Sequence, residues 1–364
     1  MYMRIASVKN RIIELALRKR SFYLMVKVLL YARGLGVRLG FVNIIKKRRF
    51  CREAERRKKI SFFDYNLLSK DFTRYIPEYF PENCYYGNNW AVRKAMNNSA
   101  MLFGTLIEHG YYWGNYVPKA SLLFDTIVTF GEQRVKHINS FLQKRGFKGQ
   151  KIKVITIGPY INYAEGIMTN SEKKDIQKKY GKILLVFPSH SIEGVIYEFN
   201  INDFISEINK VKGKFHFDNV FICMYWKDVL DKRYIDDYER NRFKIITAGH
   251  INDPNFLSRL KDIIDVSNMT MSNFIGTHIG YCLARGKPHY LFYQSQVIKG
   301  RNVDLEFRDR KSKEHVESLI REHNEIIEAF SVCVNRITEK QTRVYKKYWG
   351  GNDVKCYFLE KRGG

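Results

Sequence analysis

One stretch of the chain, residues 245–292, constrains the fold and its chemistry more than any other. A short apolar run there ends in Thr-Ala-Gly-His at 247–250, and Ser-Asn-Phe-Ile-Gly-Thr-His follows at 272–278. Small hydroxyl residues and glycines between a strand and a helix leave backbone N–H groups free to bind a phosphate. The dipole of the helix also favours the negative charge of the phosphate. The pattern therefore indicates a phosphate-bearing ligand at strand-to-helix turns.

Length and composition predict a folded α/β protein of two lobes. A chain of 364 residues can bury two cores. Its 45% hydrophobic and 15% aromatic content excludes disordered and collagen-like classes. We expect four segments. They are a basic amphipathic helical segment at 1–60, an N-terminal acceptor lobe at 61–165, a C-terminal nucleotide-donor lobe at 166–305, and a C-terminal helix at 306–364 that packs across both lobes.

Strand-like and helix-like runs alternate within both lobes, which is typical of parallel sheets. Strands are predicted at 101–107, 127–130 and 152–157 in the first lobe, and at 183–187, 220–224, 244–247 and 290–293 in the second. Helices are predicted at 132–145, 170–180, 201–212 and 255–264, with a further helical pattern from 312 to about 346.

Residues 1–60 carry most of the positive charge. They contain 18 Lys and Arg against three Glu, an excess of 15 out of a net +26 for the chain, and residues 46–49 are all basic. Basic helices with an apolar face lie in the headgroup layer of anionic membranes. We therefore expect residues 1–60 to bind an anionic membrane surface. A solvated or protein-covered helix pair and a nucleic-acid surface are the alternatives.

The expected location is cytoplasmic, peripheral on the inner face of the cell membrane. No apolar run approaches the roughly 18 to 20 residues that a spanning helix needs, and no small-residue cleavage site follows the apolar run that begins at Phe22. Six cysteines form no C-x-x-C pair and the chain has no D-x-D. We therefore expect no metal site and no cofactor.

Ligands of open α/β sheets lie beyond the carboxyl ends of the strands, so four turns form the candidate site. Four of the nine histidines fall in these turns. Strand-end hydrogen bonds, helix caps and tight turns are the structural alternatives for each position. The candidates are Glu108 and His109; Ser189, His190 and Ser191; Gly249 and His250; and Ser272, Asn273, Gly276, Thr277 and His278.

His109 is the favoured general base. The ordinary pKa of histidine lies near neutral pH, whereas a glutamate reaches that range only when it is desolvated. Because neighbouring side chains on a strand alternate, only one of Glu108 and His109 can face a cleft. Lys287, in the Gly-Lys-Pro run at 286–288, is more typical of a helix end that enters the next strand.

The residues at 272–281 and 286–288 resemble bacterial GT-B-type glycosyltransferases of surface-polysaccharide (capsule or O-antigen) biosynthesis. The stretches 125–132, 158–160 and 184–190 are similar to the seam between lobes in that superfamily. The resemblance, over roughly residues 100–295, implies two Rossmann-like lobes facing a cleft and usually no catalytic metal. It also implies a nucleotide-sugar diphosphate held by Ser272, Asn273, Thr277 and His278, a nucleotide or phosphate beside 188–191, and an acceptor facing Glu108 and His109.

The sequence departs from the family at 281–284. Tyr-Cys-Leu-Ala stands there, where many members have a Glu that holds the donor ribose. The Glu-His-Gly and Gly-Thr-His turns also resemble the CDP-glycerol-type polyol-phosphate transferases.

Three functions follow from these observations. The first is a metal-independent glycosyltransferase that moves a sugar from a nucleotide-sugar donor to a lipid-linked glycan or surface-polysaccharide acceptor. The second is a CDP-linked polyol-phosphate transferase. The third is a non-enzymatic nucleic-acid-binding protein, which ranks last because no RRM, KH or zinc-finger signature is present.

Overall fold

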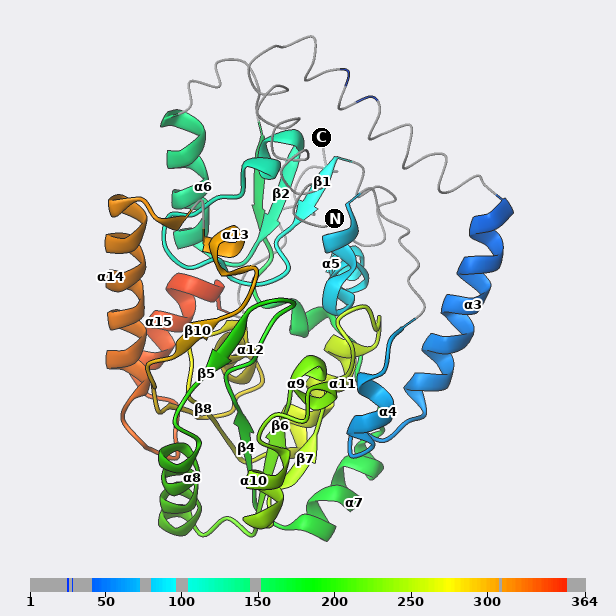
Figure 1. Ribbon diagram of the computed structural model, residues 1–364, viewed down its shortest axis with the longest axis vertical. Coiled ribbons are helices and arrows are strands. Elements are labelled where there is room, and N and C mark those ends of the chain that lie inside the picture. Colours follow the sequence, from blue (N-terminus) through cyan, green and yellow to red (C-terminus); the bar gives the residue numbers. More distant parts are fainter. Residues whose placement is uncertain are drawn as a thin grey trace, which may run out of the picture.

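The structure is a computed structural model that describes Met25, Val28 and residues 41–72, 80–95, 104–144, 152–307 and 310–351. Two parallel sheets organise this part of the chain, the smaller in the upper half of Figure 1 and the larger in the lower half. The smaller has the order β1-β2-β3, formed by β1 (Thr105–Ile107), β2 (Thr126–Thr129) and β3 (Lys153–Thr156).

The larger sheet has the strand order β7-β6-β4-β8-β9, and all of its strand pairs are parallel. The chain begins this sheet at its centre and proceeds first to one edge and then to the other. The order therefore reverses between β4 and β8, which is the switch point at which such sheets bind ligands. The strands are β4 (Ile183–Phe187), β6 (Asn219–Cys223), β7 (Lys244–Ile246), β8 (Met269–Ser272) and β9 (His289–Leu291).

Helices surround both sheets, and a short antiparallel pair stands apart from them. The pair is β5 (Ile196–Glu198) with β10 (Val297–Lys299). The helices are α3 (Phe41–Lys58), α4 (Tyr65–Ser69), η1 (Pro81–Gly87), α5 (Asn88–Ala95), η2 (Lys119–Leu123), α6 (Glu132–Lys144), η3 (Tyr160–Tyr163), α7 (Asn170–Tyr180), α8 (Ile201–Phe215), α9 (Trp226–Leu230), α10 (Ile235–Arg240), α11 (Phe256–Val266), α12 (Thr277–Ala284), α13 (Val303–Phe307), α14 (Lys313–Phe330) and α15 (Glu339–Trp349).

Local sequence explains where several elements begin. The five residues Ile-Leu-Leu-Val-Phe of β4 are all buried, as expected of a central parallel strand covered on both faces. Thr169 and Thr338 each form a capping box, with Glu172 and Gln341 respectively, at the starts of α7 and α15. These local sequences therefore favour the elements that the structure has at these positions.

One hydrophobic core joins the two sheets. It contains Val128 of β2 and Leu185 of β4 together with Trp349 of α15. A second cluster lies between the larger sheet and α8, and a third, smaller one includes Ile127 of β2 and Ile138 of α6. Helix α15 contacts both α6 and α12, so the C-terminal helices touch elements of both sheets.

Most of the expected elements are confirmed. All the helices predicted between 132 and 264 form, apart from residue 145, which lies outside the described residues. The predicted strand at 101–107 is β1 from Thr105 onward, and residues 101–103 also lie outside the description. The expectation of one helical pattern from 312 to 346 is wrong in detail, because α14 ends at Phe330 and α15 begins at Glu339. Strands β5, β8 and β10 were not predicted.

The expected basic helices fall only partly within the described chain. Residues 1–40, apart from Met25 and Val28, lie outside it, whereas α3 carries the basic run 46–49. Within the described ranges, every helix is too short or too polar to cross a bilayer.

Two glycines provide a matched test of the packing between α12 and α15. A Cβ on Gly280 would lie 2.2 Å from Cδ1 of Trp349, whereas a Cβ on Gly213 of α8 would meet nothing within 4 Å. We expect Gly280→Ala to lower the free energy of unfolding by about 1–3 kcal/mol through overpacking. Gly213→Ala should raise it by up to about 1 kcal/mol through helix propensity. Urea unfolding measures both, and equal effects of the two substitutions would contradict the packing.

Candidate functional site

The turns that follow β4 and β8 meet at the switch point. The backbone N–H of Ser189 donates to Oδ1 of Asn273 at 2.7 Å, and Nδ2 of Asn273 donates to Oε1 of Gln294 at 3.0 Å. Asn273 is fully buried. Its amide therefore bridges the turns after β4, β8 and β9 and fixes their spacing.

The Ser272 hydroxyl is also committed within the protein. Its Oγ lies 3.0 Å from Nε2 of His289 and donates to the carbonyl of Phe274 at 3.0 Å. Nδ1 of His289 lies 2.8 Å from Oγ1 of Thr270, so both ring nitrogens have partners. Ser272 and Asn273 thus hold the turns in position. Their side-chain contacts differ from the direct phosphate contacts predicted for them.

His278 has a nitrogen that no protein group satisfies. It stands in the first turn of α12, with its ring centroid 4.7 Å from that of Phe274 and 5.0 Å from that of Phe187. Its Nε2 is buried without a hydrogen-bond partner. A Cβ on Gly276 would lie 2.8 Å from Nδ1 of His278, so glycine is needed for the ring to lie there. Burial, with His289 and His190 nearby, holds the pKa of His278 well below its ordinary value.

The turn after β4 places His190 against aromatic rings. The ring stacks on Tyr225 at 4.3 Å and meets the edge of Phe274 at 5.6 Å. Burial lowers the pKa of His190 to about 4. The next residue, Ser191, donates its backbone N–H to Asp228 at 3.1 Å, and burial raises the pKa of Asp228 to about 6. Ser191 is thereby fixed inside the protein, while His190 contributes a ring to the turn.

The turn after β1 reaches the start of α12. The backbone N–H of Tyr111 donates to Oγ1 of Thr277 at 2.9 Å. A Cβ on Gly110 would lie only 3.2 Å from the same oxygen. Two turns from different sheets, more than 160 residues apart in sequence, are therefore in direct contact.

His109 lies in this turn and is partly open to solvent. Its side chain is 31% exposed, and its Nδ1 lies 3.3 Å from the hydroxyl of Tyr112 and 3.9 Å from Oε2 of Glu82. Its backbone carbonyl accepts a hydrogen bond from Nδ2 of Asn88 at 3.1 Å. Both the ring and the backbone of His109 are thus held by neighbouring groups, while part of the ring remains accessible.

Glu108 faces the opposite way, as the alternation of strand neighbours predicts. Its carboxylate accepts from Nη2 of Arg134 at 2.6 Å and from Oγ1 of Thr129 at 2.6 Å, and the residue is 2% exposed. The catalytic role expected of Glu108 stays a prediction, and in this geometry its carboxylate is already engaged by Arg134 and Thr129. Glu108 anchors the turn that carries His109.

Aromatic residues that the sequence did not single out connect these turns. Tyr86, at a left-handed φ of 59°, places its hydroxyl 3.4 Å from that of Tyr225 and its ring 6.4 Å from that of His109. Tyr225 and Phe274 each follow a strand of the larger sheet, which is a signal that could have identified them. Tyr86 follows no strand, and its sequence context gives no such signal.

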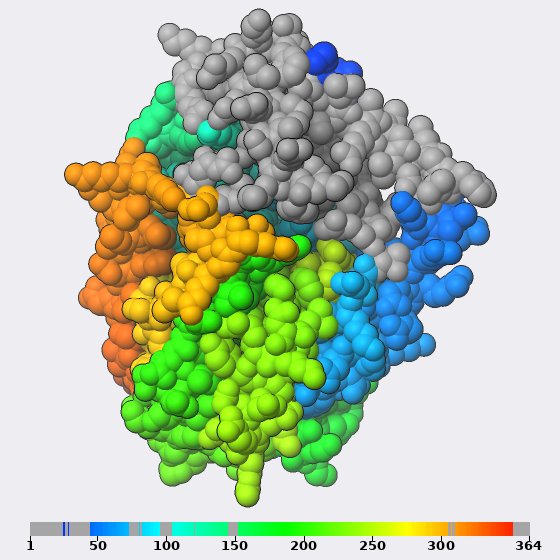
Figure 2. Space-filling view, in the orientation of Figure 1, coloured from blue at the N-terminus to red at the C-terminus, as the bar shows by residue number. Residues whose placement is uncertain are grey.

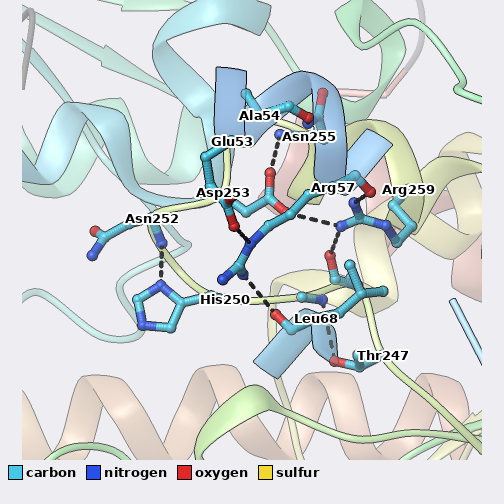
Figure 3. A network of polar contacts seen from close by, with 12 residues as sticks. Glu53, Ala54, Arg57, Leu68, Thr247, His250, Asn252, Asp253, Asn255 and Arg259 are labelled. Carbon is cyan, nitrogen blue, oxygen red and sulfur yellow. Dashed lines mark hydrogen bonds and ion pairs between the residues drawn. The ribbon is translucent and has the colours of Figure 1, made fainter. Parts of the chain in front are cut away.

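Gly249 and His250 belong to a different network, at the outer strand β7 (Figure 3). His250 is 4% exposed, its Nδ1 accepts from the N–H of Asn252 at 3.1 Å, and its ring packs on Trp226 at 4.2 Å. A Cβ on Gly249 would lie 2.8 Å from Nη1 of Arg259. Both residues therefore have packing contacts, and the ring of Trp226, which packs on His250, lies 5.7 Å from the ring of Tyr225.

The same network fastens α3 to the larger sheet (Figure 3). Arg259 donates to the carbonyls of Ala248 at 2.5 Å and Arg57 at 3.0 Å. Arg57, only 1% exposed, donates to the carbonyl of Leu68 at 3.0 Å. Buried guanidinium groups thus tie the end of the basic helix to the turn after β7.

In the part of the chain that the structure describes, no group of three or more His, Cys, Asp or Glu side chains is arranged to hold a metal ion. The candidate site is instead built from backbone amides, imidazoles and aromatic rings.

No protein-family model matches the sequence, and no curated protein matches it. Similar solved structures include the wall teichoic acid polymerase TagF, at 11% identity, with 68% of this chain and 64% of that chain covered and a TM-score of 0.39. Another is HepE of Anabaena in complex with UDP, at 11% identity, with 72% of both chains covered and a TM-score of 0.33. A third is MnaA of S. aureus with UDP, at 11% identity, with 70% of this chain and 76% of that chain covered and a TM-score of 0.33.

This chain spans 55–64% of the length of the TagF chains that it matches. All these TM-scores lie below 0.5, so the similarities establish neither the fold nor the activity of this chain.

Two histidines with lowered pKa values predict how stability depends on pH. Burial lowers the pKa of His289 to about 3 and that of His190 to about 4, so both are neutral in the folded protein at pH 5–7. The unfolded chain protonates them below about pH 6.5. It therefore binds more protons, and the free energy of unfolding falls as the pH decreases from 7 to 5. The raised pKa of Asp228 acts in the opposite direction below about 6.

We expect His289→Gln to reduce the fall in unfolding free energy by up to about 1.4 kcal/mol per pH unit below 6.5. Thermal or urea unfolding at pH 7, 6 and 5 measures this slope. His216→Asn, at the exposed left-handed end of α8, is the control and should keep the wild-type slope. Identical slopes for wild type and His289→Gln would show that this imidazole is not buried in its neutral form.

Proposed function

We propose that this chain is a metal-independent glycosyltransferase of GT-B type, which transfers a sugar from a nucleotide-sugar donor to a glycan acceptor. One observation carries the proposal. The turn with His109 touches the start of α12 at the switch point of the larger sheet, through the 2.9 Å hydrogen bond from Tyr111 to Thr277. A group transfer needs an acceptor side and a donor side within reach of each other, and this contact supports that arrangement.

The donor diphosphate fits the start of α12. Gly276 there makes no side-chain capping hydrogen bond, so the first amides of this helix are not capped by a side chain. Such amides and the helix dipole attract phosphate oxygens. His278, kept neutral by its low pKa, can donate from the unpartnered Nε2. The stacked rings of His190 and Tyr225 offer a flat surface for the nucleoside.

The acceptor hydroxyl fits beside His109. In the proposed step the imidazole takes the proton of the hydroxyl, whose oxygen bonds to the anomeric carbon of the sugar. The bond from that carbon to the diphosphate oxygen breaks, and the nucleoside diphosphate leaves with the electron pair. The amides of α12 and His278 stabilise the charge that develops on it. Glu108 contributes by fixing the turn rather than by exchanging a proton.

A donor screen separates this function from the transfer of a polyol phosphate. The free chain is melted with millimolar UDP-, GDP-, dTDP- and CDP-linked sugars and with CDP-glycerol, because a ligand of the folded state raises Tm by mass action. A shift with a nucleotide-sugar supports the glycosyltransferase. A shift with CDP-glycerol alone supports the second function, and the absence of any shift contradicts both.

The role of His109 predicts a loss of chemistry without a loss of donor binding. Once the donor is known, His109→Ala should lower kcat by roughly 100- to 10,000-fold, since a general base contributes that factor. The donor Kd should remain unchanged, whereas His278→Ala should weaken donor binding. The exposed His216→Asn is the control for both. Undiminished turnover by His109→Ala removes this residue from the mechanism.

We further propose that the acceptor is lipid-linked and that residues 1–60 bind the anionic inner face of the cell membrane. The support comes from α3, which stands at the edge of the molecule (blue, on the right of Figure 2). Its Ile44 and Ile45 are 46% and 45% exposed beside the exposed cations 46–49. Apolar side chains next to cations match a headgroup layer.

Charge removal on α3 tests this attachment. We expect the triple substitution of Lys46, Lys47 and Arg48 by Gln to weaken binding to phosphatidylserine-containing liposomes by roughly 10- to 100-fold, since each cation contributes about 1 kcal/mol before screening. The control replaces Lys174, Lys178 and Lys179 of α7 by Gln, which removes the same charge elsewhere. Cosedimentation measures both. Equal losses in the two variants would show that net charge, and not α3, governs binding.

A further inference from the structure

A cavity that the proposed donor and acceptor positions do not use lies between the loop after β1, helix α6 and the start of α14. Its volume is about 320 Å³, at the lower end of the range for small-ligand sites. Residues from three separate segments line it, including Asn115 and Tyr116 of the loop, His137 and Ser140 of α6, and His315 of α14.

Two histidines in its wall are held by other protein groups. His137 is 9% exposed, and its Nε2 lies 2.5 Å from Oε1 of Glu322. His315 is 4% exposed, and its Nδ1 lies 3.2 Å from Oδ1 of Asn115. The other oxygen of Glu322 accepts from the N–H of Gly114 at 2.7 Å, which ties α14 to the loop. A cavity with fixed walls is ready to receive a ligand without rearrangement.

Charged side chains of both signs lie at the cavity. Lys144 pairs with Glu314, Nε2 of His137 contacts Glu322, and Lys119 also lines the wall. Beside them the wall carries the amide of Asn115, the hydroxyl of Ser140 and the rings of Tyr116 and Phe141. A neutral ligand with many hydroxyl groups and an apolar face meets that description.

We infer that this cavity binds one sugar unit of a glycan. This inference rests on the proposed function, because the cavity adjoins the position proposed for the acceptor. The Tyr112 ring lies 6.2 Å from the Tyr116 ring of the cavity and 5.6 Å from the His109 ring. A glycan whose reacting hydroxyl reaches His109 would place an adjacent sugar unit in the cavity. The site then selects acceptors by that adjacent sugar.

Binding of simple sugars to the full chain tests the inference independently of catalysis. The probes are the methyl glycosides of glucose, galactose, mannose, rhamnose and N-acetylglucosamine, followed by NMR of the histidine ring protons up to about 50 mM. At least one neutral glycoside should shift the resonances of His137 or His315. Asn115→Ala and Ser140→Ala should each weaken the binding of that glycoside by about 5- to 10-fold, as expected for a lost hydrogen bond.

The control is Lys136→Ala, an exposed position of α6 outside this cavity, which should leave binding unchanged. Inorganic phosphate is the competing probe. Binding of phosphate alone, of no glycoside at all, or of a glycoside with undiminished affinity in both cavity variants would each overturn the inference. Nucleotide binding is measured in the same samples. Glycoside binding without any nucleotide binding would remove the proposed function and leave the sugar site intact.

Discussion

The contact between the turn after β1 and the start of α12 is the constraint on which the arrangement of the site depends. A single hydrogen bond, from the Tyr111 amide to the Thr277 hydroxyl, adds only about 1 kcal/mol to stability. The shared core beneath it, with Val128, Leu185 and Trp349, supplies the larger hydrophobic term. The core fixes the distance between the sheets, and the hydrogen bond fixes which turns face each other.

Much of the fold follows from periodicity and capping, because these act locally. The apolar run of β4 and the helix α7 were both predicted at the residues where the structure has them. Strand β8 was not predicted, since its sequence Met-Thr-Met-Ser lacks the β-branched apolar run of a buried strand. Its position beside β4 is decided by tertiary pairing that no local window contains. The missed strand is nonetheless the one that creates the switch point.

The candidate site was likewise predictable only in part from the sequence. That His109 and His190 lie just beyond the ends of strands could be predicted from the rule for open sheets, and the turn before His278 could be predicted from its glycine and hydroxyl residues. The sequence could not predict which side-chain atoms lack a hydrogen-bond partner within the protein, because those partners are distant in sequence. Arg134 pairs with Glu108 from 26 residues away, and His289 engages Ser272 from 17 residues away. Sequence reasoning thus located the turns, whereas the hydrogen-bond partners of their side chains depend on the tertiary structure.

Two neighbouring histidines, His278 and His289, differ in how fully the protein satisfies their ring nitrogens. Their ring centroids are close, with His278 and His289 5.6 Å apart, and burial lowers the pKa of both. Yet both nitrogens of His289 have hydrogen-bond partners, whereas Nε2 of His278 has none. A buried polar atom without a partner costs about 1–3 kcal/mol. A ligand oxygen at the start of α12 would recover that cost, and its negative charge would raise the pKa of the imidazole. The same atom that weakens the empty protein would therefore strengthen its complex with a diphosphate.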